Sequence, residues 1–233
     1  IQGREGAWGY RLGASNERAK GISVKLPGAF DFNPDKDSYD FSSFDAKLQY
    51  KLDEQQSFAL SLLASDGEYG FDSKTTGLTA ANTLALSYPS VRQAVLTWKA
   101  KVNGDWQSLL TMARSQELAK SRYLRESDQL FFSESQFNTA RNQVTWQNDI
   151  RWAKGTLTLL AEEMRDKVDS TTLYKVSERN VQGAMASYSW RDEVWDALAT
   201  VRFNRNSQFG NFNVSILCCP IYCPFVTFIT QFM

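Results

Sequence analysis

The residue types that carry most enzyme chemistry are scarce in this chain of 233 residues. It contains no histidine, which excludes Ser-His-Asp and Cys-His catalytic groups and histidine metal ligands. Three acidic residues, Asp66, Glu68 and Asp72, suggest the paired carboxylates of a glycosidase, but nothing in the sequence fixes their separation. The three cysteines (Cys218, Cys219 and Cys223) lack the usual spacing and the fourth ligand of a metal site. The sequence therefore does not predict an enzyme.

The amino-acid composition narrows the possible classes of protein further. Lys+Arg and Asp+Glu both number 26, so no net charge favours nucleic acid as a partner. No apolar run in the body approaches the roughly 20 residues of a membrane helix. The length suits one domain or a piece of a larger β domain. The start, Ile1-Gln2-Gly3-Arg4, has no signal-peptide pattern and leads almost directly into a strand. We expect the interior of a longer protein.

The elements that must position any site are β-strands. Between Arg141 and Trp152, polar and apolar side chains alternate strictly, and the alternation resumes after a turn at Ala153-Lys154-Gly155. A period of two is typical of a strand, because successive side chains point to opposite faces. One face is charged and polar and must meet water, whereas the other is apolar and must be covered. The sequence predicts a hairpin whose apolar face packs on a second sheet or on lipid.

The same pattern recurs along the chain, with short turns and long loops in strict succession. Short turns are expected near 53–56, 103–105, 153–155 and 191–193, and long loops near 66–89, 115–138, 166–178 and 204–211. Hence all short turns lie at one end of the sheet and all long loops at the other. This asymmetry is typical of outer-membrane β-barrels, and strands of about 10 residues fit a tilted membrane span.

Aromatic side chains give a second, independent indication. Large rings on the apolar faces lie beside the short turns: Tyr50, Phe58, Trp106, Trp152, Trp190 and Trp195. A membrane interface selects such a belt of rings at one level. The opposite faces carry charges (Lys47, Lys51, Arg141, Asp149 and Arg151) that suit a wide, wet or plugged lumen. A soluble antiparallel sandwich or an extracellular barrel remains the alternative, because alternation alone fits it equally well.

Several short motifs resemble one family of such barrels. They are Val201-Arg202 with Asn206-Ser207-Gln208-Phe209-Gly210, Thr145-Trp146-Gln147-Asn148, Glu178-Arg179-Asn180, and the acidic Asp35-Lys36-Asp37 before the strand from Phe44. Over most of the chain from Trp8 to Asn211, the sequence resembles the TonB-dependent outer-membrane receptors, most of all the cobalamin transporter family. The resemblance implies an all-β, antiparallel transmembrane β-barrel of roughly 22 strands around a plug. Residues 1–213 would supply about nine or ten of those strands.

The resemblance also implies a function. The receptor would capture cobalamin or a related corrinoid from outside, lie in outer-membrane lipid, and be driven by the TonB complex. That complex would act through a plug that this sequence does not include, and the closing strand of the barrel is not included either. No bond is made or broken. A receptor for a siderophore or another metal complex is the alternative within the class, and a passive pore or an adhesin is the alternative outside it.

A metal site is implied in the same way. In cobalamin receptors, acidic outer loops bind calcium and order the substrate site; Asp35 and Asp37 match that acidic pair, and Asp72 matches a position in the next long loop. Calcium prefers several carboxylate and carbonyl oxygens, so clustered aspartates suit it. Phe71 falls where an aromatic contacts the ligand, and an earlier ligand position departs from the family as Ser23. The alternative interpretation is that Asp-rich loops are simply solvated.

The tail, residues 214–233, departs from the pattern. It is uncharged, holds all three cysteines, and is interrupted by Pro220 and Pro224, which disfavour a central strand. Since the family would continue with another alternating strand, we interpret the tail as an atypical, hydrophobic and non-native terminus.

Overall fold

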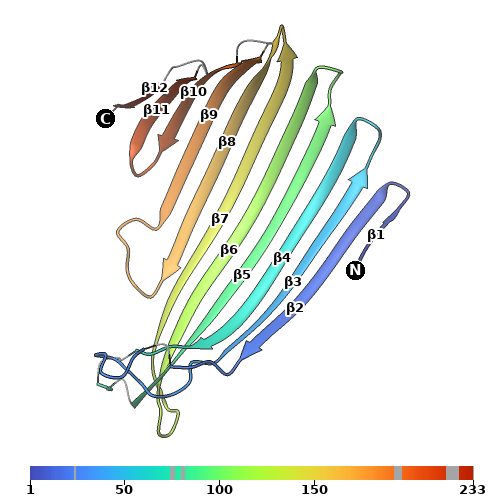
Figure 1. Cartoon of the computed structure of the whole chain (residues 1–233). Coiled ribbons are helices and arrows are strands. Elements are labelled where there is room, and N and C mark those ends of the chain that lie inside the picture. The colour runs from blue at the N-terminus through green and yellow to red at the C-terminus, as the bar shows by residue number, and fades with distance from the viewer. Residues whose placement is uncertain (24, 74–76, 80–81, 192–195, 219–225, 233) are drawn as a thin grey trace.

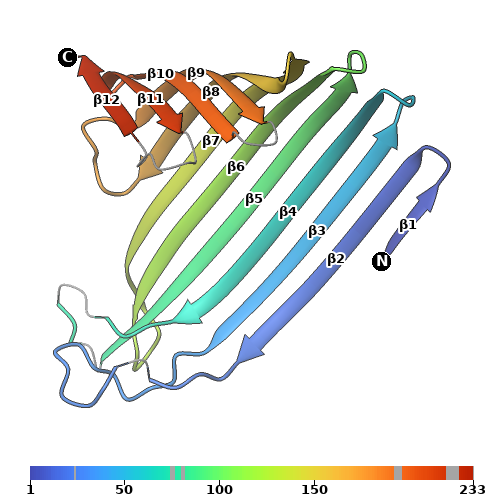
Figure 2. The ribbon, with the colours of Figure 1, turned by 45° about the horizontal axis from the view of Figure 1, so that its top comes forward.

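A single antiparallel sheet makes up almost the whole molecule (Figure 1). The computed structural model describes residues 1–233 except 24, 74–76, 80–81, 192–195, 219–225 and 233. In this part of the chain, twelve strands pair in sequence order. They are β1 (Gln2–Glu5), β2 (Trp8–Ala19), β3 (Tyr39–Lys51), β4 (Gln56–Gly70), β5 (Thr83–Lys101), β6 (Trp106–Arg125), β7 (Phe131–Trp152), β8 (Gly155–Ser170), β9 (Glu178–Arg191), β10 (Asp196–Asn206), β11 (Gly210–Cys218) and β12 (Val226–Phe232). The sheet curls, so that β8–β12 turn out of the plane of β2–β6 (Figure 2).

The expected hairpins form at the short turns. Trp152 pairs with Gly155 across the β7–β8 turn, where Ala153 takes a positive φ of 55°. In the β5–β6 turn, the Asn103 Oδ1 accepts hydrogen bonds from the backbone N–H groups of Asp105 and Trp106, at 2.9 Å each. The turn expected at 191–193 falls largely outside the described residues. Short turns therefore gather at one end of the sheet, and the loops after β2, β4 and β6 gather at the other (Figures 1 and 2).

Several strands are longer than the sequence predicts, and this corrects the expected loops. Strand β6 continues to Arg125 and β7 begins at Phe131, so most of the loop expected at 115–138 is strand. Only residues 207–209 separate β10 from β11, where a loop of 204–211 was expected. Glu134 pairs with Lys120 at 2.9 Å and with Arg122 at 2.9 Å in this extension. In these extensions polar side chains occur on both faces, for example Lys120 on one and Glu117 on the other, so hydrophobic alternation no longer marks the strand.

One face of the sheet is apolar and uncovered; we call it the apolar face, and the opposite one the polar face. Among the described residues the only buried hydrophobic side chains are Ala85 and Ala100. Large apolar side chains stand exposed instead: Leu48, Leu60, Leu62, Leu96, Met112, Val144 and Trp146. The register aligns Tyr50 and Phe58 of the predicted aromatic belt in one cross-strand row near the short turns, and it adds Trp8 and Trp98 to that row. A soluble sandwich would bury this face against a second sheet.

On the polar face, charged side chains pair across strands. Asp166 of β8 accepts hydrogen bonds from Arg141 of β7 (2.7 Å) and Arg179 of β9 (2.5 Å). Arg202 of β10 forms an ion pair with Glu162 of β8. These polar contacts, rather than a hydrophobic core, hold this side of the sheet.

The C-terminal tail joins the sheet in two pieces. Strand β11 runs to Cys218 and pairs with β12, so residues of the tail extend the sheet where no further strand was expected. The two prolines and Cys219 and Cys223 lie outside the described residues. No helix in the described part is long and apolar enough to cross a membrane.

Candidate metal and ligand site

The three aspartates singled out in the sequence meet at the long-loop end of the sheet. Asp35 and Asp37 precede β3, and Asp72 follows β4. Because β3 and β4 are antiparallel neighbours, the start of β3 and the end of β4 lie at the same end of the sheet. One carboxylate oxygen from each residue lies within 4.8 Å of the other two. We call this group the acid cluster.

Backbone packing around Asp37 fixes the cluster. The Asp37 N–H donates to the carbonyl of Ile22 at 3.3 Å, and the Gly70 N–H donates to the carbonyl of Ser38 at 2.9 Å. At Gly21, whose φ is +64°, an added Cβ would lie 1.8 Å from the Asp37 carbonyl oxygen. Only glycine allows so close a backbone approach. The loop before β3 is thereby pressed onto the end of β4.

Burial makes the acid cluster electrostatically costly. Asp37 and Asp72 are buried, and the Oδ1 atoms of Asp35 and Asp72 are buried with no hydrogen-bond partner among the described residues. Burial raises the pKa of Asp35 above its ordinary value, and the negative charges of Asp37, Glu126 and Asp72 raise it further. Buried carboxylates without partners destabilise the ionised state. A divalent cation would supply both the missing charge and the missing partner.

The structure places Glu126 and Asn33, which the sequence pattern did not single out, beside the acid cluster. Glu126 directly follows β6, and its Oε2 accepts a hydrogen bond from the buried Asn33 Nδ2 at 3.2 Å. The sequence pattern did not single out Glu126, because it placed the end of β6 about ten residues too early. The position of Glu126 at the long-loop end of the sheet is the signal that could have identified it. Ser23 also joins, since its Oγ lies 3.3 Å from Asp72 Oδ2 and 3.0 Å from the Asn33 carbonyl oxygen.

Phe71 belongs to a line of aromatic rings on the polar face, next to the acid cluster. Neighbouring centroids along the line lie 6.0 to 6.4 Å apart, in the order Tyr39, Phe41, Tyr69, Phe71 and Tyr123. Gly67 makes room for Phe41, because an added Cβ there would lie 2.3 Å from that ring. We call this line the aromatic ledge. Flat aromatic surfaces stack on the planar or apolar parts of a ligand.

Of the three acidic residues considered for a glycosidase, Asp66 and Glu68 both lie on β4 and line one surface hollow, whereas Asp72 lies apart from them. Asp66 lies within β4, and its two carboxylate oxygens accept hydrogen bonds from Arg92 Nη2 at 2.8 and 2.6 Å. Asp72 belongs to the acid cluster instead. A carboxylate held by an arginine is a poor general acid, because the ion pair favours its charged form.

Comparisons with known proteins identify the fold. No protein-family model matches this sequence, and no curated protein does. Among solved structures, the siderophore receptor PirA from Acinetobacter baumannii superposes on 93% of this chain with a TM-score of 0.66 and 14% identity. A variant of the ferric enterobactin receptor PfeA from Pseudomonas aeruginosa superposes on 91% with a TM-score of 0.63 and 11% identity. This chain spans 36% and 37% of the length of those two chains.

The likeness confirms the expected fold class. The chain is all-β and forms part of an antiparallel transmembrane β-barrel. The acid cluster and the aromatic ledge lie at the long-loop end of this wall.

Proposed function

We propose that this chain is part of the barrel of an outer-membrane, TonB-dependent receptor that takes up a metal complex of the iron–siderophore type. The observation that carries the proposal is the uncovered apolar face of a sheet that has the fold of two siderophore receptors. Lipid covers such a face, because no second layer of protein does. The receptor binds and transfers its ligand without making or breaking a bond, so it is not an enzyme.

The ligand enters at the long-loop end in this proposal. Short turns face the periplasm and long loops face outward in barrels of this kind. The aromatic ledge, including Phe71, then lies on the inner wall just below the outer loops and forms a stacking surface for the ligand. The names of the two similar receptors favour a siderophore over the corrinoid that the sequence motifs suggest.

Cobalamin, or a related corrinoid, is kept as a second candidate because of the acid cluster. The sequence motifs linked Asp35, Asp37 and Asp72 to the calcium site of cobalamin receptors, and these residues do lie together. If the ligand is cobalamin, calcium bridges the loop before β3 and the loop after β4, and it orders the surface where Phe71 contacts the ligand. Calcium there would be a structural ion rather than a participant in chemistry.

Ligand binding by the full-length protein that contains this chain separates the candidates. The purified protein in detergent is titrated with ferric enterobactin, a ferric hydroxamate and cyanocobalamin, each with calcium and with a chelator. Saturable binding of a ferric complex supports the first candidate, and calcium-dependent binding of cyanocobalamin supports the second. Binding of none of the three by correctly folded protein contradicts the proposed function.

Variants locate the site in the same titrations. We expect Phe71→Ala to weaken binding about tenfold or more, as removal of one stacked ring does. The matched control is Phe209→Ala, which removes an exposed aromatic ring from the turn between β10 and β11. Equal effects of the two variants would show that Phe71 has no special contact with the ligand.

A further inference from the structure

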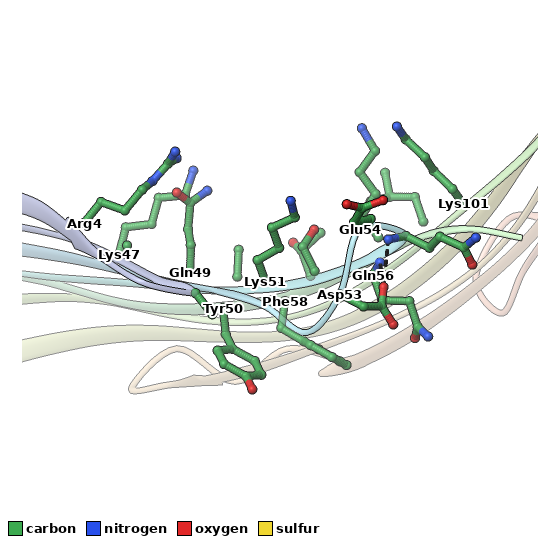
Figure 3. A pocket seen from close by; sticks show the side chains of 18 of the residues that line it. Arg4, Lys47, Gln49, Tyr50, Lys51, Asp53, Glu54, Gln56, Phe58 and Lys101 are labelled. Carbon is green, nitrogen blue, oxygen red and sulfur yellow. Dashed lines mark hydrogen bonds between the residues drawn. The ribbon is translucent and has the colours of Figure 1, made fainter. Parts of the chain in front are cut away.

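The polar face of β1–β6 changes its charge from one end of the sheet to the other. Cationic side chains gather beside the short turns, around a hollow of about 570 Å³: Arg4, Lys47, Lys51, Lys99 and Lys101. In Figure 3 the labelled Lys47 and Lys51 point to one side of the sheet, whereas the rings of Tyr50 and Phe58 point to the other. We call this part of the polar face the basic half. Its outer limit on β2 and β3 is the ion pair between Arg11 and Asp45.

The polar face between the basic half and the long loops carries no cationic side chain. We call this part the outer floor; it consists of alternate residues of the ranges 15–17, 39–43, 63–69, 85–91 and 115–123. The structure describes every one of these positions, and none of them is Lys or Arg. Apart from the rings of the aromatic ledge, the outer floor holds small, hydroxyl and aliphatic side chains and the acids Glu17 and Glu117.

The nearest arginines on the polar face are already neutralised. Arg141 of β7 and Arg179 of β9 both donate hydrogen bonds to Asp166, at 2.7 and 2.5 Å. Asp166 is buried, so this ion pair is shielded from water and is not readily exchanged for a ligand. An anion that reaches the outer floor therefore finds no free counter-charge on the neighbouring strands β7–β9.

The loops around the outer floor do not supply the missing cations. Two basic side chains there are paired with acids of their own loops: Lys25 with Asp31 at 2.5 Å, and Arg125 with Asp128 at 3.2 Å. The other described cations of the loops after β2, β4 and β6 are Lys20 and Lys36. They are outnumbered by the carboxylates of the acid cluster and Glu126.

Glu17 places a carboxylate beside the aromatic ledge. The Tyr39 hydroxyl donates a hydrogen bond to Glu17 Oε1 at 2.8 Å, and Glu17 lies opposite Phe41 in the β2–β3 register. A carboxylate and the face of an aromatic ring both attract a cation, and neither attracts an anion. The serine hydroxyls of the outer floor can donate and accept hydrogen bonds, which suits neutral polar groups of a ligand.

We propose that the aromatic ledge and the outer floor select a neutral or cationic metal complex and disfavour an anionic one. The inference rests on the proposed function, because it names the charge class of the ligand that the receptor captures. An anionic complex would lose hydration at this wall without gaining a counter-charge. A neutral complex needs only the stacking surface and the hydroxyl groups. A cationic complex is attracted by Glu17 and repelled by the basic half, and both forces hold it at the ledge.

The proposal distinguishes between the ligands considered for this receptor. Ferric enterobactin, which gives one of the two similar receptors its name, is an anionic catecholate complex. We expect this receptor to disfavour it. Neutral or cationic ferric hydroxamates fit the outer floor, and so does cyanocobalamin, which is neutral overall.

A charge series built on one iron complex tests the proposal. The full-length protein in detergent is titrated with iron(III) desferrioxamine B, whose free amine makes the complex cationic. Its N-acetyl and N-succinyl derivatives have the same iron–hydroxamate core but are neutral and anionic. We expect the cationic and neutral complexes to bind, and the anionic one to bind about tenfold more weakly or worse.

Two variants locate the preference on this wall. Glu17→Gln keeps an oxygen acceptor for Tyr39 but removes the charge, so the cationic complex should lose its advantage over the neutral one. Ser65→Lys adds a cation to the outer floor and should strengthen binding of the anionic derivative about tenfold. The matched controls, Glu54→Gln in the β3–β4 turn and Ser61→Lys in the basic half, should change neither preference. If both variants behave like their controls, the proposal is wrong.

The outcomes of the charge series separate this proposal from the proposed function. If ferric enterobactin or the N-succinyl derivative binds as tightly as the neutral complex, the charge preference is overturned and the receptor still binds a siderophore. If cyanocobalamin alone binds, the charge preference is supported and the ligand is that of the second candidate. If correctly folded protein binds none of these complexes, both the proposal and the proposed function are wrong.

Discussion

Asp35 and Asp72 come from loops that flank β3 and β4 and meet in one cluster, and each has a buried carboxylate oxygen without a hydrogen-bond partner in the described part of the chain. The negative charge of Asp72 contributes to the raised pKa of Asp35. Buried carboxylates placed this close together are stable in their ionised form only when a cation is bound beside them. The first two predictions follow from this pair.

Removal of one carboxylate should weaken cation binding. We expect Asp72→Asn to lower the affinity for calcium, or for terbium as a luminescent probe, by at least tenfold, about 1.4 kcal/mol. Terbium luminescence of the full-length protein in detergent measures it. The control is Asp169→Asn, which neutralises an exposed acid at the end of β8. Equal affinities for the wild type and both variants would show that the acid cluster binds no cation.

The cation affinity should also depend on pH. Protons and cations compete for Asp35, whose pKa is raised by burial and by neighbouring acids. Affinity should therefore fall as the pH falls through that raised pKa. Without a cation the sign is opposite: the folded loops favour protonated Asp35, so their stability is full at low pH and declines as the pH rises through the raised pKa. Terbium titrations across this range, repeated with Asp35→Asn, should show the dependence flattened in the variant.

The apolar face should tolerate no charge at its centre. We expect Val144→Arg to destabilise the membrane-embedded protein by about 2–4 kcal/mol, because the side chain would lie in lipid. Thr145→Arg, on the adjacent residue of β7, points to the polar face and should cost much less. Urea unfolding of the full-length protein in liposomes compares them. Similar small losses for both variants would favour a soluble sheet, since exposed positions usually change stability by less than about 0.5 kcal/mol.

Gly183 should be needed for an ion pair that skips a strand. Arg202 of β10 reaches Glu162 of β8 across β9, and a Cβ at Gly183 would lie 2.9 Å from Glu162 Oε1 and 3.2 Å from Arg202 Nη2. We expect Gly183→Ala to displace the pair and cost about 1 kcal/mol in the same urea unfolding. Gly104→Ala, with nothing within 4 Å of the added Cβ, is the control. A loss for Gly104→Ala as large as that for Gly183→Ala would remove the ion-pair explanation.

Residues 1–233 alone should not form a stable soluble protein. Among the described strands, the first and the last, β1 and β12, each pair with a neighbour on one side only. Unpaired edges in lipid leave backbone groups without hydrogen bonds, and in water they promote aggregation. Ultracentrifugation in detergent-free buffer should therefore show aggregates. A monomeric, protease-resistant product there would contradict both this prediction and the membrane assignment.

Much of the fold was readable from local pattern. The alternation in Arg141–Trp152, the short turns near 53–56, 103–105 and 153–155, and the predicted pairing of Tyr50 with Phe58 beside a short turn reappear in the structure. Trp195 of the predicted aromatic belt lies outside the described residues. The ends of β6 and β7 were not readable, since their polar extensions carry no alternation. The sequence motifs named Asp35, Asp37 and Asp72 but not Glu126 or Asn33, whose approach depends on where β6 ends.

By itself, the sequence determined which side chains lie on the apolar face and which lie on the polar face, because that assignment needs only the two-residue period of a strand. It also determined which end of the sheet carries short turns. Only the tertiary structure decided which loops meet and how Arg202 crosses β9 to Glu162. Those contacts depend on cross-strand register and strand length, which arise from pairing between distant segments rather than from any local pattern.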